Sequence, residues 1–81
     1  NPKHRASFQV AAAKGHSILY LSGIGLSSNR EAASNYGTIS TARKIAGQVR
    51  DVGRKLGIVR VAVVTTHDSA GAIRSFLLGK A

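Results

Sequence analysis

The chain has 81 residues and a formal net charge of +9, with twelve Lys and Arg against three acidic residues. A domain of this size buries only about 60% of the surface that its unfolded chain exposes, and a chain without cysteine has neither a disulfide framework nor a thiolate metal site. At 43% hydrophobic residues the chain is too apolar for a disordered basic tail, yet no apolar run reaches the about 18 residues that a transmembrane helix needs. We therefore expect one small domain over residues 1–81 whose folded state a large partner stabilises.

The imbalance of charge indicates the nature of that partner. A solvated surface needs only a mixture of signs, which does not explain twelve cations against three acids and a pI near 11.4. Such an excess is typical of proteins that bind a polyanion. We expect nucleic acid, with an anionic membrane surface as the second possibility.

The first part of the chain predicts a basic arm at residues 1–5, followed by two strands. Because the sequence starts at Asn1 and not at Met, we expect a mature or trimmed chain. Residues 6–13 alternate weakly between polar and apolar side chains, and residues 17–22 are rich in β-forming residues. The short link at residues 14–16 predicts that the two strands form an antiparallel hairpin.

A segment rich in glycine, serine and asparagine, residues 23–37, precedes the clearest helix. The segment predicts a loop that is longer than usual connections and therefore functional. Residues 38–56 place apolar side chains at helical spacing, with Thr38 as the N-cap and Gly57 as the stop signal. The side chains expected to face the sheet are Ile39, Ala42, Ile45, Ala46, Val49, Val52 and Leu56.

Two glycines interrupt this helix, and the sequence leaves their role open. Gly47 and Gly53 each weaken a helix by about 1 kcal/mol relative to alanine. They either allow close approach to a neighbouring backbone or are simply tolerated.

The last part of the chain predicts a strand and a second helix. Residues 58–64 are apolar on both faces except at Arg60, which favours an interior strand covered on both sides. Residues 67–69 (His-Asp-Ser) offer an N-cap for a short helix over residues 70–78. The side chains of this helix expected to be buried are Ala70, Ile73 and Leu77, with Phe76 at the edge.

These elements together predict an α/β fold. Their order is β-β-α-β-α, with the long loop before the first helix. A helix before an interior strand favours a right-handed crossover. We therefore expect a small mixed β-sheet with two packed helices.

Catalysis finds little support in the sequence. General acid–base chemistry needs paired carboxylates or a carboxylate beside a histidine, and the one close pair, His67-Asp68, stands where a helix cap is expected. Metal binding needs several converging carboxylates or histidines, and the chain has few. The glycines at residues 23–25 lack the Gly-x-Gly-x-x-Gly spacing of a dinucleotide loop. We expect no enzyme, no catalytic residue, no metal, no cofactor and no small-molecule substrate.

RNA binding is favoured because the cations are organised along the chain. On the long helix Arg43, Arg50 and Arg54 fall on one stripe, opposite the apolar face. Terminal arms and hairpin turns can also reach into RNA grooves. Few aromatic residues are available for stacking, which favours structured RNA recognised through its backbone and shape. The residues expected to bind RNA are Lys3, His4, Arg5, Lys14, His16, Asn29, Arg30, Arg43, Lys44, Arg50, Arg54 and Arg74.

Several segments, in family order, resemble the universal large-subunit ribosomal protein eighteen family, which carries 5S rRNA. Residues 8–10 are similar to the family's Ala-Gln-Val strand, and residues 15–22 to its Gly-Lys-Thr-Leu-Ala-Ser-Ala-Ser strand. Residues 42–46 resemble its Ala-Ala-Lys-Ile-Gly helix opening, residues 57–63 its Gly-Ile-x-x-Val-x-Val/Phe strand, and residues 71–74 its Gly-Arg-Val-Lys. The resemblance implies a ribonuclease-H-like ribosomal protein fold, contact with rRNA and neighbouring ribosomal proteins, and a structural role in the large subunit.

The chain also departs from that family. It has Thr65-Thr66 where the family usually has Asp-Arg, and residues 70–72 (Ala-Gly-Ala) where the family has His-Gly-Arg. The family's first strand and longer basic arm are absent or lie before Asn1. These departures favour a mitochondrial or other organellar ribosome over a bacterial one, and they weaken the expectation of direct 5S rRNA contact.

Three alternatives stay open. The small-subunit ribosomal protein eleven family has a related fold, and residues 15–20 and 71–74 fit it, although its Lys-Gly-x-Gly-x-Gly-Arg loop and basic C-terminal tail are missing. A diverged nuclease is the second, although its two-metal chemistry needs a carboxylate cluster. A protein-interaction module is the third, in which the charge serves solubility alone.

Overall fold

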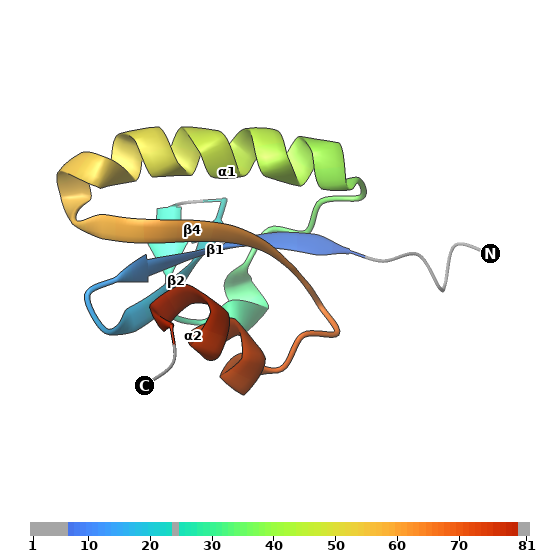
Figure 1. The fold of residues 1–81 in the computed structure, drawn as a ribbon. Coiled ribbons are helices and arrows are strands. Elements are labelled where there is room, and N and C mark those ends of the chain that lie inside the picture. Colours follow the sequence, from blue (N-terminus) through green and yellow to red (C-terminus); the bar gives the residue numbers. More distant parts are fainter. Residues whose placement is uncertain (1–6, 24, 80–81) are drawn as a thin grey trace.

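The computed structural model describes residues 7–23 and 25–79, which form a mixed α/β fold of a four-stranded sheet and two helices (Figure 1). Short 3-10 segments, η2 and η3, lie between the main elements. In chain order the elements are β1 (Phe8–Lys14), β2 (Ser17–Ser22), β3 (Gly25–Ser27), η2 (Arg30–Ala32), α1 (Ile39–Gly53), η3 (Arg54–Leu56), β4 (Ile58–Thr65) and α2 (Ala70–Leu78).

The sheet has the order β3-β2-β1-β4, and all three neighbouring pairs are antiparallel. The expected mixed sheet is therefore wrong, and so is the expected interior position of the strand over residues 58–64, because β4 is an edge strand. The right-handed crossover rule concerns parallel strands and does not apply here.

The segment between β3 and α1 explains the antiparallel pairing of β4. After β3 the chain runs back beside the sheet, where Ser34 N donates to Leu21 O and Tyr36 exchanges two backbone hydrogen bonds with Phe8 at the start of β1. Helix α1 therefore begins beside the start of β1 and ends beside its last residues (Figure 1). The following strand starts there, with Ile58 opposite Lys14, and so runs against β1.

The expected hairpin of the first two strands is confirmed. Strands β1 and β2 pair antiparallel from Ala11 opposite Tyr20 to Lys14 opposite Ser17. Gly15, in the connecting turn, has φ +62°, a conformation that suits glycine. The second strand has the predicted bounds, whereas the first is shifted toward the turn.

The expected loop at residues 23–37 is more ordered than the sequence indicates, since it contains both β3 and η2. Strand β3 pairs with β2, and the Ser22 hydroxyl donates to Gly25 O at 2.7 Å. The strand is only three residues long. A strand this short within a glycine-rich segment gives no alternating sequence pattern from which it could be predicted.

Helix α1 begins at the predicted cap, and the helical stretch ends at the predicted Gly57, but its last turn, Arg54–Leu56, is the 3-10 segment η3 and not α-helix. The Thr38 Oγ1 accepts a hydrogen bond from Thr41 N, and Gly57 follows η3 in the left-handed region at φ +89°. The helix lies over β4 and β1 (Figure 1). Within the described residues no element lies above the side of α1 and η3 toward β2, where Val52 and Leu56 are 66% and 55% exposed. Ile39 is 42% exposed as well, so these three residues contradict the expected buried face.

The two glycines of α1 have different surroundings. A Cβ at Gly53 would lie 2.5 Å from Ile58 Cδ1 and 2.9 Å from Ile58 Cβ. A Cβ at Gly47 would meet nothing within 4 Å. Gly53 therefore allows the close approach of α1 to β4, whereas Gly47 is tolerated.

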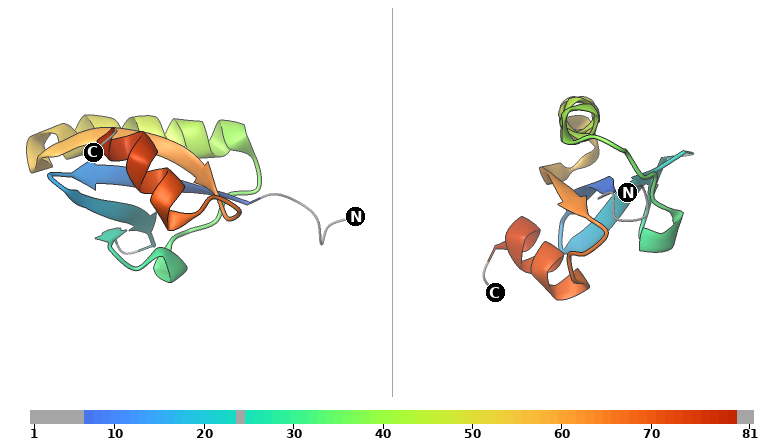
Figure 2. Two further views of the ribbon diagram at one scale, coloured as in Figure 1. Left: turned by 60° about the horizontal axis from the view of Figure 1, so that its bottom comes forward. Right: turned by 90° about the vertical axis from the view of Figure 1, so that its right-hand side faces the viewer.

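Helix α2 covers the opposite face of the sheet from α1 (Figure 2). Its N-cap is Ser69, whose hydroxyl accepts from Ala72 N, as the sequence predicts. Ile73 and Leu77 are 2% exposed, but Ala70 is exposed because it is the first residue after the turn that leaves β4. The core on this face consists of Ala11, Ala13, Tyr20, Ala33, Ala62, Val64, Ile73 and Leu77.

Candidate nucleic-acid interface

The residues expected to bind RNA fall into four groups, three of which the structure describes. The arm residues Lys3, His4 and Arg5 lie outside the described residues. The helix cations, the hairpin-turn residues and the two residues after β3 are described, and their surroundings differ.

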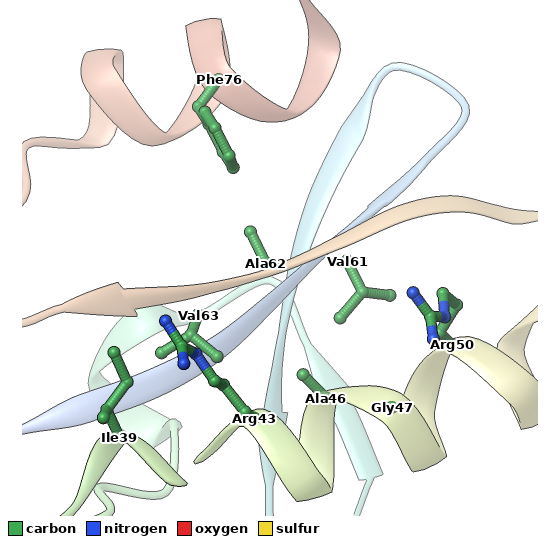
Figure 3. Close-up of a pocket in the computed structure, with 9 residues that line it drawn as sticks. All are labelled: Ile39, Arg43, Ala46, Gly47, Arg50, Val61, Ala62, Val63 and Phe76. Carbon is green, nitrogen blue, oxygen red and sulfur yellow. The ribbon is translucent and has the colours of Figure 1, made fainter.

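The α1 cations are all exposed, as the helical stripe predicts. Arg43, Lys44 and Arg50 project from α1, and Arg54 and Lys55 are exposed in η3, which follows it directly. Arg43 and Arg50 lie seven residues apart on the same side of α1, and their guanidinium groups extend toward β4 (Figure 3). Arg43 and Arg50 therefore border the outer edge of the sheet, and their expected position opposite the sheet-facing side of the helix is wrong.

A second group of basic side chains gathers at the end of the molecule that holds the β1–β2 turn. His16 in the turn and Arg74 in α2 line one shared hollow. Arg60 in β4 pairs with Ala13, beside the same turn, and its Nη1 donates to Phe76 O at 3.3 Å. Helix α1 also ends here (Figure 1). This hairpin-end cluster consists of Lys14, His16, Arg54, Lys55, Arg60 and Arg74.

The two site residues expected in the segment after β3 also make hydrogen bonds that hold the fold, and their contact with RNA stays a prediction. The Asn29 Oδ1 accepts from Glu31 N and caps η2. The half-buried Arg30 donates through Nη2 to Thr65 O at 2.7 Å and through Nε to Gln9 Oε1 at 3.3 Å. These bonds tie η2 to β1 and to the end of β4 through Nε and Nη2 of the guanidinium.

A cleft of about 360 Å³ lies along the outer edge of β4, between the two helices (Figure 3). Helix α1 borders it with Arg43 and Arg50, and α2 borders it with Phe76. In Figure 3 Val61 and Val63 point toward α1, whereas Ala62 points toward α2. The remaining lining residues are Ile39, Ala46 and Gly47.

A second, more apolar groove of about 430 Å³ lies on the uncovered side of α1, beside β2 and β3. It accounts for the exposure of Val52 and Leu56, which line it. Its other apolar side chains are Leu19, Leu21, Leu26, Val49 and Ile58.

The three acids lie on separate elements. Glu31 is in η2 and Asp51 in α1, whereas the Oδ2 of Asp68 accepts from Thr65 N at 2.8 Å in the turn before α2. Within residues 7–23 and 25–79, no group of three His, Asp or Glu side chains is placed to hold a metal ion. In the same part of the chain, neither helix is long and apolar enough to cross a membrane.

Two residues of the candidate interface, Arg60 and Phe76, were not among the residues predicted to bind RNA. Arg60 is the one charged residue in an apolar strand, which marked it as unusual without indicating where its side chain points. Phe76 was expected at the edge of α2 but without a role, because only the tertiary structure brings it to the same cleft as Arg43 and Arg50.

Comparisons with known proteins give no independent assignment: no protein family, curated protein or solved structure matches this chain.

Proposed function

We propose that this chain is a structural constituent of the ribosome that binds rRNA, in the large subunit. The observation that carries the proposal is the exposure of its charge. Eight of the nine Lys and Arg in the described residues are exposed, the exception being Arg30. They follow α1 and gather in the hairpin-end cluster, which suits a partner with regularly spaced phosphates.

The finer fold assignment is part of this proposal. Three strands followed by α1, β4 and α2, with a helix on each face of the sheet, support a ribonuclease-H-like ribosomal protein fold. The antiparallel pairing of β4 with β1 argues against it, because the expected sheet is mixed. The proposed function therefore depends on the charged surface, whereas the family and the organellar ribosome depend on the sequence resemblance alone. The small-subunit protein eleven family is the alternative.

The dependence of rRNA binding on salt tests the proposal. If the surface makes about six to ten phosphate contacts, affinity for purified rRNA falls about 10³–10⁵-fold between 50 mM and 200 mM salt, because binding releases counterions. A binding isotherm that does not respond to salt contradicts the proposal.

A triple variant locates the contact. Changing Arg43, Arg50 and Arg54 to Gln should weaken binding and lower the slope of log affinity against log salt by about 0.9 for each phosphate that the variant no longer neutralises. Ser40→Ala with Gln48→Ala is the matched control, since both residues are exposed and uncharged on the same helix. Unchanged rRNA binding by the triple variant would instead favour a protein-interaction module. The apolar groove beside α1 is the observation that favours a protein-interaction module as the second candidate.

The nuclease alternative has its own test. Cleavage of rRNA that requires magnesium, and that is lost in Asp68→Asn but retained in the control variant, would favour an enzyme. We expect no such cleavage, because a two-metal site needs a cluster of carboxylates and the three acids lie on separate elements.

A further inference from the structure

The cleft along the outer edge of β4 combines three kinds of group that can contact a nucleotide: cations, an aromatic ring and backbone hydrogen-bonding groups. Its two cations, Arg43 and Arg50, come from α1, and its aromatic ring, Phe76, comes from α2. Phe76 is 66% exposed and points toward the strand between the helices (Figure 3). Aromatic faces and guanidinium groups are the surfaces on which unstacked RNA bases and their phosphates bind.

The third kind of group is the backbone of β4. Phe8 exchanges both of its backbone hydrogen bonds with Tyr36, at 2.9 and 2.7 Å, so it forms no such pair with its β4 partner, Thr65. Partners in an antiparallel ladder alternate between bonded and non-bonded pairs. Val63 and Val61, two and four residues before Thr65, therefore turn their N–H and C=O groups away from β1.

These backbone groups face the outer edge of the sheet. Strand β4 pairs with β1 alone within the described residues, so the N–H and C=O of Val61 and Val63 have no strand partner on that side. They lie on the side of β4 where Arg43, Arg50 and Phe76 converge. The cleft thus offers hydrogen-bond donors and acceptors next to an aromatic face and two cations.

We propose that this cleft binds one unpaired nucleotide that is extruded from a folded RNA. The base stacks on Phe76, its polar edge meets the backbone of Val61 and Val63, and the flanking phosphates bind Arg43 and Arg50. This inference rests on the proposed RNA binding and adds the feature that is recognised. A single aromatic ring accommodates one base, which agrees with recognition of structured RNA and not of a long single strand.

An extended peptide that adds a strand to β4 is the other occupant that a free edge admits. The charge of the cleft favours RNA, because its ionisable lining residues are the two arginines. An added strand needs the backbone edge alone and does not explain an exposed aromatic ring that shares a cleft with two guanidinium groups. We therefore make the peptide an outcome of the test.

The experiment compares a fully paired RNA hairpin with hairpins that are identical except for one bulged nucleotide, which is A, C, G or U. Stacking of a base on an aromatic side chain tolerates any sequence, so the full-length protein should prefer the bulged hairpins by about 5- to 150-fold. Phe76→Leu keeps an apolar side chain at an exposed position, so the fold should persist, and circular dichroism checks this. We expect this variant to lose the preference while it still binds the fully paired hairpin.

Val59→Ala is the matched control, because Val59 is a 73% exposed apolar residue of the same strand that does not line the cleft. It should keep the preference. Equal binding of bulged and paired hairpins by the unchanged protein, or a preference that survives Phe76→Leu, overturns the nucleotide site while leaving RNA binding intact. Displacement of both hairpins alike by an extended peptide of alternating Glu and Val would assign the edge to a protein strand and overturn the inference. Binding of neither hairpin, at low salt, would remove the proposed function and this inference together.

Discussion

Replacing Gly53 with alanine tests whether α1 is held against β4 by a glycine. Gly53 has φ −69° and ψ −19°, which any residue adopts, so backbone strain plays no part. The added Cβ would stand 2.5 Å from Ile58 Cδ1 and 2.9 Å from Ile58 Cβ. The second atom is fixed to the backbone of β4, so a side-chain rotation cannot remove the contact. The helix or the strand has to shift.

Two opposing effects decide the magnitude. Alanine in place of a helical glycine stabilises by at most about 1 kcal/mol. Overpacking of a buried contact destabilises by about 1–3 kcal/mol, and the short Cβ–Cβ distance places Gly53→Ala near the upper value. We expect a net loss of about 2 kcal/mol, which lowers the Tm of a domain of this size by about 8–16 °C. Gly47→Ala meets no atom within 4 Å and should gain about 1 kcal/mol.

Thermal and urea unfolding followed by circular dichroism measures both variants. Ile58→Val supplies a third measurement, since it removes the nearest atom, Cδ1. By itself it should cost about 0.5–1.5 kcal/mol, but less in the Gly53→Ala background, with a coupling of about 0.5 kcal/mol or more. If Gly53→Ala stabilised as Gly47→Ala does, or if the two changes were additive, the close contact would not exist.

Two further predictions concern residues that support the fold. Arg30→Ala should destabilise by about 1.5–3 kcal/mol because it removes the charged donor to Thr65 O, and Arg30→Lys should recover only part, because an ammonium lacks the planar fork. Denaturation measures this loss, and a large fall in the rRNA affinity of the folded variant would show that Arg30 contacts RNA after all. Ser69→Ala removes the cap of α2 and should cost about 1 kcal/mol, whereas Ser69→Asp should retain most of the stability. Equal stability of these two variants and the unchanged protein would contradict the capping role.

Local signals in the sequence placed most of the elements correctly. The strand at residues 17–22, the start of α1 at Thr38, the stop at Gly57 and the helix at residues 70–78 all depend on residues that are neighbours in the chain. Caps, helical spacing and β-forming runs act within one or two turns. They can therefore be read without knowledge of the rest of the molecule.

The candidate site was predictable only in part. The exposure of Arg43 and Arg50 was predictable from helical spacing, but their position beside β4 was not, because the sequence pattern placed them opposite the sheet-facing side. The burial of Arg30 was not predictable either, since its partners Gln9 and Thr65 are 21 and 35 residues away. Phe76 likewise gained its surroundings from a strand and a helix that are distant in sequence.

What the sequence determined by itself is the set of elements, their caps and a surface of unbalanced positive charge, because each depends on composition or on short-range spacing. The direction of β4, its place at the edge of the sheet and the cleft beside it were decided only by the tertiary structure. They depend on contacts such as Tyr36 with Phe8, which bring together residues far apart in the chain. The sequence pattern of β4 does not show which strand it pairs with, or whether the pairing is parallel or antiparallel, because a strand presents the same alternating faces in either orientation.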